Sequence, residues 1–216
     1  MFRYANIPSF KNHPRPIAER ALPDGIERHL QSEAITGALR DAGYVRIGLA
    51  PFALPGDNLA LARQEGRLRR NFQGYTDDGA ETLIGLGASA IGRMPRGFVQ
   101  NAVTTRDYST RIAENRLATV RGYAFTGEDR FRADIIERVM CDMAVDISKI
   151  ARSHDRDPES AIIDRSKLES LIADGAVTID DDRISVSNGA EFLVRSVASA
   201  FDAHLARSAA THSRAV

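Results

Sequence analysis

The sequence has 216 residues, 43% hydrophobic and 27% charged, which is the composition of an ordinary globular protein. Its 29 basic and 29 acidic residues cancel, so no net charge would attract nucleic acid or an anionic membrane surface. No apolar run approaches the roughly 20 residues of a membrane span, and the N-terminus lacks the apolar core of a signal peptide. We therefore expect a cytoplasmic protein that binds neither nucleic acid nor membrane.

The first half of the chain alternates short apolar segments with a helical pattern. Residues 2–7 predict a strand, a proline-rich loop follows, and apolar residues at helical spacing predict a helix over 26–39 with Gly43 as its C-terminal cap. Tyr44–Gly48 then predicts a second strand. This order is typical of a parallel βα barrel or a doubly wound sheet, although two such strands cannot close a barrel. Asp57, after a Pro-Gly turn, predicts the start of a short helix.

A loop is predicted at Asn71-Phe72-Gln73-Gly74-Tyr75-Thr76, which has neither a helical nor a strand period. The amides of Asn71 and Gln73 and the phenol of Tyr75 could hydrogen-bond a flat polar ligand while aromatic rings pack against its faces. The alternative is an ordinary loop with two buried aromatic residues.

The segment from Leu83 to Gly92 is rich in glycine and other small residues. Small residues allow close backbone approach, either to a neighbouring element or to a ligand. The run contains neither a P-loop nor a dinucleotide-binding glycine pattern. Three nearby arginines could pair carboxylates or could simply be solvated: Arg93, Arg96 and Arg106.

The second half is mainly helical. Residues 105–115 predict a polar helix, and Arg121–Phe125 an extended segment. Thr126 and Asp129 predict a capping box, followed by an apolar helical stripe of Phe131, Ile135, Val139, Met143 and Ile147.

After this stripe, Asp157-Pro158 predicts a helix start, and a further helix precedes Gly175. Residues 177–186 predict a β-hairpin, and Asn188 with Glu191 a capping box for a last helix. The arrangement over residues 126–207 is winged-helix-like. The acidic hairpin tip and the zero net charge argue against DNA binding.

Several segments in order resemble one family. Arg70–Thr76 looks like a signature of the oxygen-independent coproporphyrinogen III oxidases, radical S-adenosylmethionine enzymes of haem biosynthesis. Further similar segments are Tyr4–Pro8, Gly43–Leu49, Leu86–Ile91, Gln100–Asn101 and His212–Val216. The resemblance implies an α/β part, the last strands of a partial TIM-like barrel (1–104), followed by a helical domain (105–216).

The resemblance also implies a function and its ligands. Family members convert coproporphyrinogen III to protoporphyrinogen IX by oxidative decarboxylation, using S-adenosylmethionine and a [4Fe-4S] cluster. By resemblance, Ala5 and Ile91 contact S-adenosylmethionine. The tetrapyrrole substrate would be the partner, with Asn71, Gln73 and Tyr75 as candidate pocket residues. We identify no catalytic or metal-binding residue.

Two departures from the family bear on activity. The family holds its cluster with a C-x3-C-x2-C motif, whereas this chain has one cysteine, Cys141, which we expect to be a buried apolar filler. Ala50-Pro51 stands where the family usually has Asp-His, a pair suited to proton handling. The chain is therefore expected to be a truncated, C-terminal half that is inactive without a separately encoded cluster-bearing half. The alternatives are a non-catalytic tetrapyrrole-binding or interaction module, or a gene remnant.

Overall fold

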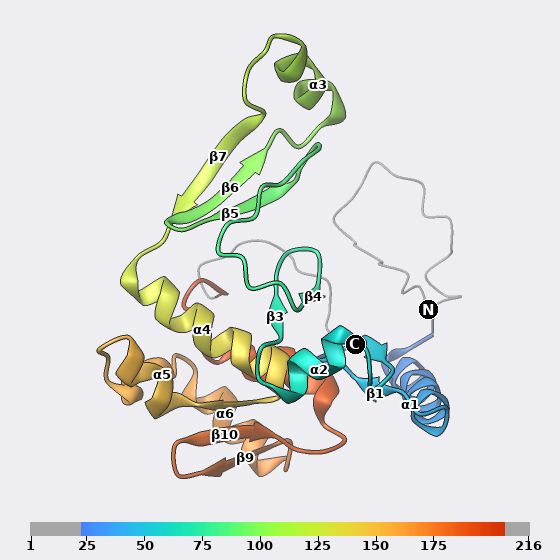
Figure 1. The fold of residues 1–216 in the computed structure, drawn as a ribbon. Coiled ribbons are helices and arrows are strands. Elements are labelled where there is room, and N and C mark those ends of the chain that lie inside the picture. Colours follow the sequence, from blue (N-terminus) through green and yellow to red (C-terminus); the bar gives the residue numbers. More distant parts are fainter. Residues whose placement is uncertain (1–22, 206–216) are drawn as a thin grey trace.

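Two clusters of buried apolar side chains organise the protein, whose computed structural model describes residues 23–205. All residues of the smaller cluster except Cys141 lie in the first half of the chain, and the buried residues of the larger cluster lie in the second half. A sheet that contributes to neither cluster projects from the rest of the described chain as an arm (Figure 1). None of the described helices is long and apolar enough to cross a membrane.

The first part begins with helix α1, whose N-cap Asp24 accepts a hydrogen bond from the backbone N–H of Glu27. Short antiparallel hairpins and a helix capped by Asp57 follow. Their bounds are α1 Gly25–Asp41, β1 Val45–Arg46, β2 Phe52–Ala53, α2 Asn58–Gln64, β3 Arg69–Arg70 and β4 Tyr75–Thr76. Ile47 and Leu68 are fully buried in the smaller cluster, which Cys141 completes from the second half of the chain.

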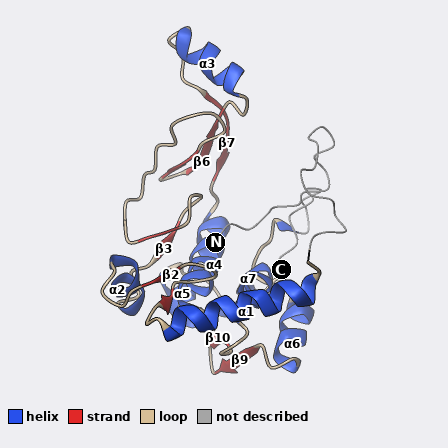
Figure 2. Cartoon of the chain, turned by 90° about the vertical axis from the view of Figure 1, so that its right-hand side faces the viewer, coloured by secondary structure: helices blue, strands red, loops and turns tan. Residues whose placement is uncertain are grey.

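The arm is a three-stranded antiparallel sheet in the order β5-β6-β7, with a helix between its last two strands. The elements are β5 Ile91–Met94, β6 Gly97–Asn101, α3 Thr105–Ala113 and β7 Thr119–Ala124. Figure 2 shows α3 at the far end of the arm. Every residue of β7 is exposed, so the sheet presents broad open surfaces.

The second half is built on helix α4, which packs against both clusters. A second three-stranded sheet, in the order β8-β10-β9, lies below it. The elements are α4 Gly127–Asp142, β8 Ala144–Asp146, α5 Ile147–Ser153, η2 Pro158–Ala161, α6 Arg165–Ala173, β9 Val177–Asp180, β10 Arg183–Val186, η3 Glu191–Leu193 and α7 Val194–Ser199. Phe131, Ile135 and Phe201 are fully buried in the larger cluster.

Many local predictions are confirmed. The mixed α/β class, the helix after Asp57, the capping box of Thr126 and Asp129, the start at Asp157 and the hairpin of β9 and β10 are all present. The apolar stripe is confirmed as far as Val139, but α4 ends at Asp142 because Met143 adopts a left-handed conformation with φ 59°. Ile147 therefore opens a new helix, α5.

One expectation differs from the structure. The capping box of Asn188 and Glu191 is wrong, because Ala190 precedes η3 without any side-chain cap and the Glu191 carboxylate accepts from Gly189 N–H at 3.0 Å. Every strand pair among residues 23–205 is antiparallel. The predicted strand at residues 2–7 lies outside the described residues, so its parallel pairing with the strand at Tyr44–Gly48 stays a prediction.

Candidate functional site

The segment singled out from the sequence is the turn between β3 and β4. The Asn71 Oδ1 accepts hydrogen bonds from the backbone N–H groups of Gln73, at 2.8 Å, and Gly74, at 3.2 Å. This bonding shapes the turn, and Gly74 adopts a positive φ of 144° that favours glycine. The Gln73 side chain is exposed. Asn71 therefore supports the backbone while Gln73 faces solvent.

Tyr75 points inward from this turn. Its hydroxyl accepts a hydrogen bond from Leu49 N–H at 2.9 Å and donates one to the Met140 carbonyl at 3.0 Å. Its ring covers Gly48, where an added Cβ would overlap the ring atoms. Burial raises the pKa of Tyr75, although the hydrogen bond from Leu49 opposes the rise. The phenol thus fastens the turn to α4.

A line of aromatic rings runs from the same turn into the arm. The Phe72 ring lies edge-on to Phe98 at 5.0 Å between ring centroids, and Phe98 is edge-on to Phe125 at 4.6 Å. These spacings are favourable for T-shaped aromatic pairs. Phe72 remains 55% exposed, so its ring is available to a ligand as well as to Phe98.

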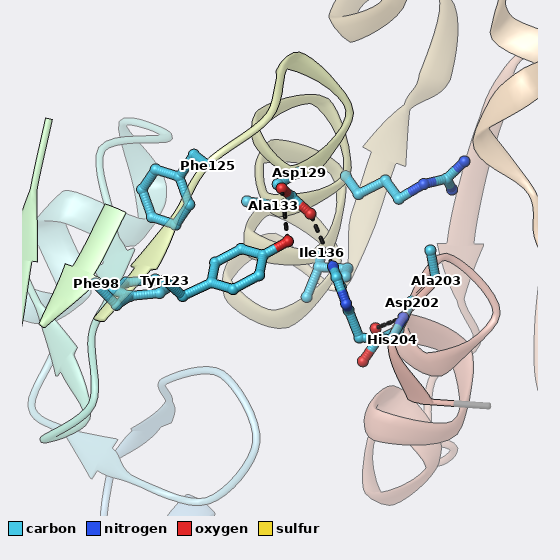
Figure 3. A pocket seen from close by; sticks show the side chains of 10 residues that line it. Phe98, Tyr123, Phe125, Asp129, Ala133, Ile136, Asp202, Ala203 and His204 are labelled. Atoms are coloured by element: carbon cyan, nitrogen blue, oxygen red, sulfur yellow. Dashed lines mark hydrogen bonds and ion pairs between the residues drawn. The ribbon is translucent and has the colours of Figure 1, made fainter. Parts of the chain in front are cut away.

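Beyond this line of rings lies a pocket of about 300 Å³ (Figure 3). The arm supplies one wall, α4 another, and the segment after α7 the third. Its lining residues are Phe98, Tyr123, Phe125, Asp129, Arg132, Ala133, Ile136, Asp202, Ala203 and His204. The volume is at the lower end of the range for small-molecule sites, so the pocket would hold part of a larger ligand.

Asp129 forms the polar end of this pocket. Its Oδ2 accepts from the Tyr123 hydroxyl at 2.9 Å and from the Thr126 N–H at 2.8 Å, and its Oδ1 lies 2.7 Å from His204 Nε2. Burial alone would raise the pKa of Asp129, but these hydrogen bonds together lower it well below its usual range. Asp129 is therefore ionised, and His204 donates to it through Nε2. In the neutral imidazole, Nδ1 is then a proton acceptor.

Arg132 also lines the pocket, but its guanidinium is engaged elsewhere. It donates to the carbonyl oxygens of Ala161, at 2.6 Å, and Ser160, at 2.8 Å, and pairs with Glu128. With its side chain only 7% exposed, Arg132 joins α4 to η2 rather than offering charge to a ligand.

The structure brings together some of the candidates named from the sequence. The turn carrying Asn71, Gln73 and Tyr75 meets the arm through Phe72, and Ile91 opens β5 of that arm, opposite Gln100. Ala5 lies outside the described residues. The Asp129–His204 pair escaped sequence reasoning, because Asp129 was recognised only as a helix cap and no local pattern marks His204.

No group of three or more His, Cys, Asp or Glu side chains within residues 23–205 could hold a metal ion. Cys141 is fully buried in the smaller cluster, and burial raises the pKa of its thiol to about 12. An iron–sulfur cluster is held by several cysteine thiolates, so one fully buried cysteine cannot hold it. Since Cys141 is the chain's one cysteine, the residues present do not fit an iron–sulfur cluster.

Comparisons with known proteins converge on one enzyme, although no protein-family model matches the chain. The chain is 53% identical over all 216 residues to an oxygen-independent coproporphyrinogen III oxidase of Bradyrhizobium diazoefficiens, covering 48% of that protein. It is 39% identical over the same length to that of Paracoccus denitrificans, again covering 48%. The chain thus spans about half the length of these curated relatives.

A solved structure agrees with the sequence comparison. The chain superposes on the coproporphyrinogen III oxidase of Escherichia coli, described as a radical SAM enzyme, with a TM-score of 0.80 and 34% identity. The match covers 88% of this chain and 44% of the other. The described fold is therefore that of about half of the Escherichia coli protein.

Proposed function

The chain is homologous along its whole length to the C-terminal half of the oxygen-independent coproporphyrinogen III oxidases, and we propose that it is the C-terminal part of such an enzyme. In that role it would take part in the oxidative decarboxylation of coproporphyrinogen III to protoporphyrinogen IX in porphyrin biosynthesis. The observation that carries the proposal is the 53% identity over all 216 residues.

The iron–sulfur cluster of the proposed enzyme would have to come from residues outside this chain. The fully buried Cys141, with its thiol pKa of about 12, supports this division of labour. When bound elsewhere in the enzyme, the cluster with S-adenosylmethionine would supply the radical chemistry, while this chain would help to bind and orient the substrate. We propose that the cluster-bearing part is a partner of this chain and that the chain alone has no turnover.

Ligand contacts extend this proposal to particular residues. Ile91 is proposed to contact S-adenosylmethionine, as is Ala5. Ile91 is half-buried at the start of β5, where it can offer a small apolar surface. Asn71, Gln73 and Tyr75 are proposed to border the tetrapyrrole. The exposed Gln73 side chain and the adjacent Phe72 ring can reach a ligand directly, whereas Tyr75 would act by holding the turn in place.

The domain architecture is part of the same proposal. The order α4, β8, α5, α6 and the β9–β10 hairpin, with the sheet order β8-β10-β9, supports a winged-helix-like domain near residues 126–207. The first part is proposed to be the end of a partial barrel. The predicted boundary at residues 104 and 105 falls inside the arm, between β6 and α3, so the arm would join the two domains. The cytoplasmic location stays a prediction.

A second candidate function is a tetrapyrrole-binding or partner-binding module without catalysis. One observation favours it: the aromatic line from Phe72 to Phe125 and the adjoining pocket are present in a chain whose thiol cannot hold a cluster. This module would bind the tetrapyrrole without changing it.

Complementation separates the two candidates. The chain would be co-expressed with the N-terminal part of the Bradyrhizobium diazoefficiens relative, and protoporphyrin formation would be measured anaerobically after cluster reconstitution. We expect activity from the pair and none from the chain alone. A Cys141→Ala chain should support the same activity, because this thiol ligates nothing. An inactive pair, in which both parts fold and the intact relative is active, would contradict the enzymatic proposal.

A further inference from the structure

One face of the arm carries a distinct set of side chains. In the β5-β6-β7 register, Ile91 lies opposite Gln100, which lies opposite Arg121, and Arg93 lies opposite Phe98, which lies opposite Tyr123. Because side chains alternate along a strand, these two rows point to the same side of the sheet. The residues of this face, which we call the arginine face, are Ile91, Arg93, Phe98, Gln100, Arg121 and Tyr123.

The two arginines of this face have no acidic partners in the structure. Among residues 23–205, neither Arg93 nor Arg121 forms an ion pair with a carboxylate. Other arginines are paired, such as Arg69 with Glu137 at 2.8 Å and Arg138 with Asp142 at 2.9 Å. The arginine face therefore carries two positive charges that are free to meet an anion.

Arg121 is oriented by a hydrogen bond to Gln100. Its Nε donates to Gln100 Oε1 at 2.7 Å, and Gln100 Nε2 in turn donates to the Ser89 carbonyl at 3.0 Å. This chain of bonds ties the guanidinium to the backbone before β5. Neither Nη group of Arg121 forms a hydrogen bond with a residue of the described range 23–205, so both can donate to a ligand in the forked geometry that suits a carboxylate.

The arginine face continues into the aromatic pocket. Phe98 and Tyr123 belong to both, and the exposed Phe72 ring packs on Phe98. The far end of the pocket holds the ionised Asp129, which would repel a carboxylate. A ligand with an apolar ring system and carboxylate arms would thus place its rings on the aromatic residues and its carboxylates on the arginines.

We propose that the arginine face and the pocket together bind the carboxylate-bearing tetrapyrrole, with Arg93 and Arg121 pairing two of its propionates. Gln100 is a positioning residue that aims Arg121. The inference rests on the proposed function and specifies where the substrate lies. Arg93 and Arg121 stand on β5 and β7, two strand spacings and two residues apart, which separates their Cα atoms by roughly 12 Å. Their long side chains can converge on one macrocycle across that distance.

Fluorescence titration of the purified chain with coproporphyrin III, an oxidised stand-in for the substrate, tests this inference. The variants are Arg93→Met and Arg121→Met, and the matched control is Arg106→Met on α3, which removes the same charge away from the arginine face. We expect each face variant to weaken binding about tenfold and the control to leave it unchanged. The tetramethyl ester of coproporphyrin III lacks the carboxylate charges. It should bind the unaltered chain and the three variants equally when the acid and the ester are titrated in the same detergent.

Gln100→Leu gives a readout of positioning. It should weaken binding of the acid through Arg121, and combining it with Arg121→Met should produce no additional loss. Equal binding of the acid by the face variants and the control would overturn the arginine assignment while leaving the enzymatic proposal, tested by complementation, intact. If the unaltered chain binds neither the acid nor the ester, no tetrapyrrole site exists here and the inference falls.

Discussion

The hydroxyl of Tyr75 offers a sharp test of how the first half of the chain is attached to α4. Tyr75→Phe removes one oxygen and keeps the ring over Gly48. Two bonds disappear, the one accepted from Leu49 N–H at 2.9 Å and the one donated to Met140 C=O at 3.0 Å. Met140 lies in the last turn of α4, where carbonyl groups lack an intrahelical partner, so its oxygen loses the partner that satisfied it.

The size of the effect follows from these two bonds. A buried hydrogen bond contributes about 1 kcal/mol net, so Tyr75→Phe should lower the free energy of unfolding by about 2 kcal/mol. For a chain of this length that corresponds to a fall in Tm of roughly 4–8 °C. Urea unfolding and a thermal melt would both measure it.

Tyr44→Phe is the matched control. Tyr44 is half-buried, and its hydroxyl forms no hydrogen bond with the described residues, so the same deletion should leave Tm nearly unchanged. If Tyr75→Phe and Tyr44→Phe have the same Tm, the Tyr75 hydroxyl does not hold the turn to α4. If Tyr75→Phe instead abolishes tetrapyrrole binding at unchanged Tm, the phenol acts on the ligand and the structural role assigned here is refuted.

Further predictions concern Gly48, Asp129 and Cys141. Gly48→Ala should lower Tm more than Tyr75→Phe, because the φ of +56° at Gly48 disfavours alanine and the new Cβ would overlap the Tyr75 ring. The control is Gly37→Ala in α1, which should raise the free energy of unfolding by about 0.5–1 kcal/mol. The depressed pKa of Asp129 means that its carboxylate stabilises the fold above about pH 4 and loses this effect in acid. The stability difference between the unaltered chain and Asp129→Asn, measured by urea unfolding, should therefore shrink from pH 6 to pH 3; a constant difference would contradict this. Cys141, with a pKa of about 12, should resist thiol reagents at pH 8 and react only in urea, and rapid labelling of the folded chain would show that it is not enclosed.

Local features of this fold could be predicted from the sequence, because a helix cap or a helical spacing of apolar residues involves only a few neighbouring residues. Asp57, the Thr126–Asp129 box and the β9–β10 hairpin are of this kind. Strand pairing is not local, so the order of elements along the chain does not show which strands are neighbours, and the antiparallel pairs of the described residues could not be predicted. Strands of two residues, such as β1 and β3, are too short to show a period.

The candidate site shows the same limit. Residue types singled out the Asn71–Thr76 turn as a candidate ligand site, which stays a prediction, but they did not indicate which parts of the chain the turn contacts. Asp129 and His204 are 75 positions apart, and Tyr75 reaches across 65 positions to Met140, so no window of sequence contains either pair. The arginine face likewise depends on the register of three strands, which places Arg121 beside Gln100 across 21 positions. Only the assembled sheet reveals which arginines share a side.

The central position of α4 has a consequence for the order in which the protein folds during synthesis. The core around Ile47 and Leu68 is closed by Cys141, and Arg138 donates to the Leu68 carbonyl at 2.6 Å from 70 positions further along. At about 5–20 residues per second, the ribosome adds that stretch in roughly 4–14 s. During this interval the apolar side chains of Ile47 and Leu68 have left the ribosome without their final neighbours. Until α4 has been synthesised, this segment therefore stays open to chaperones and proteases.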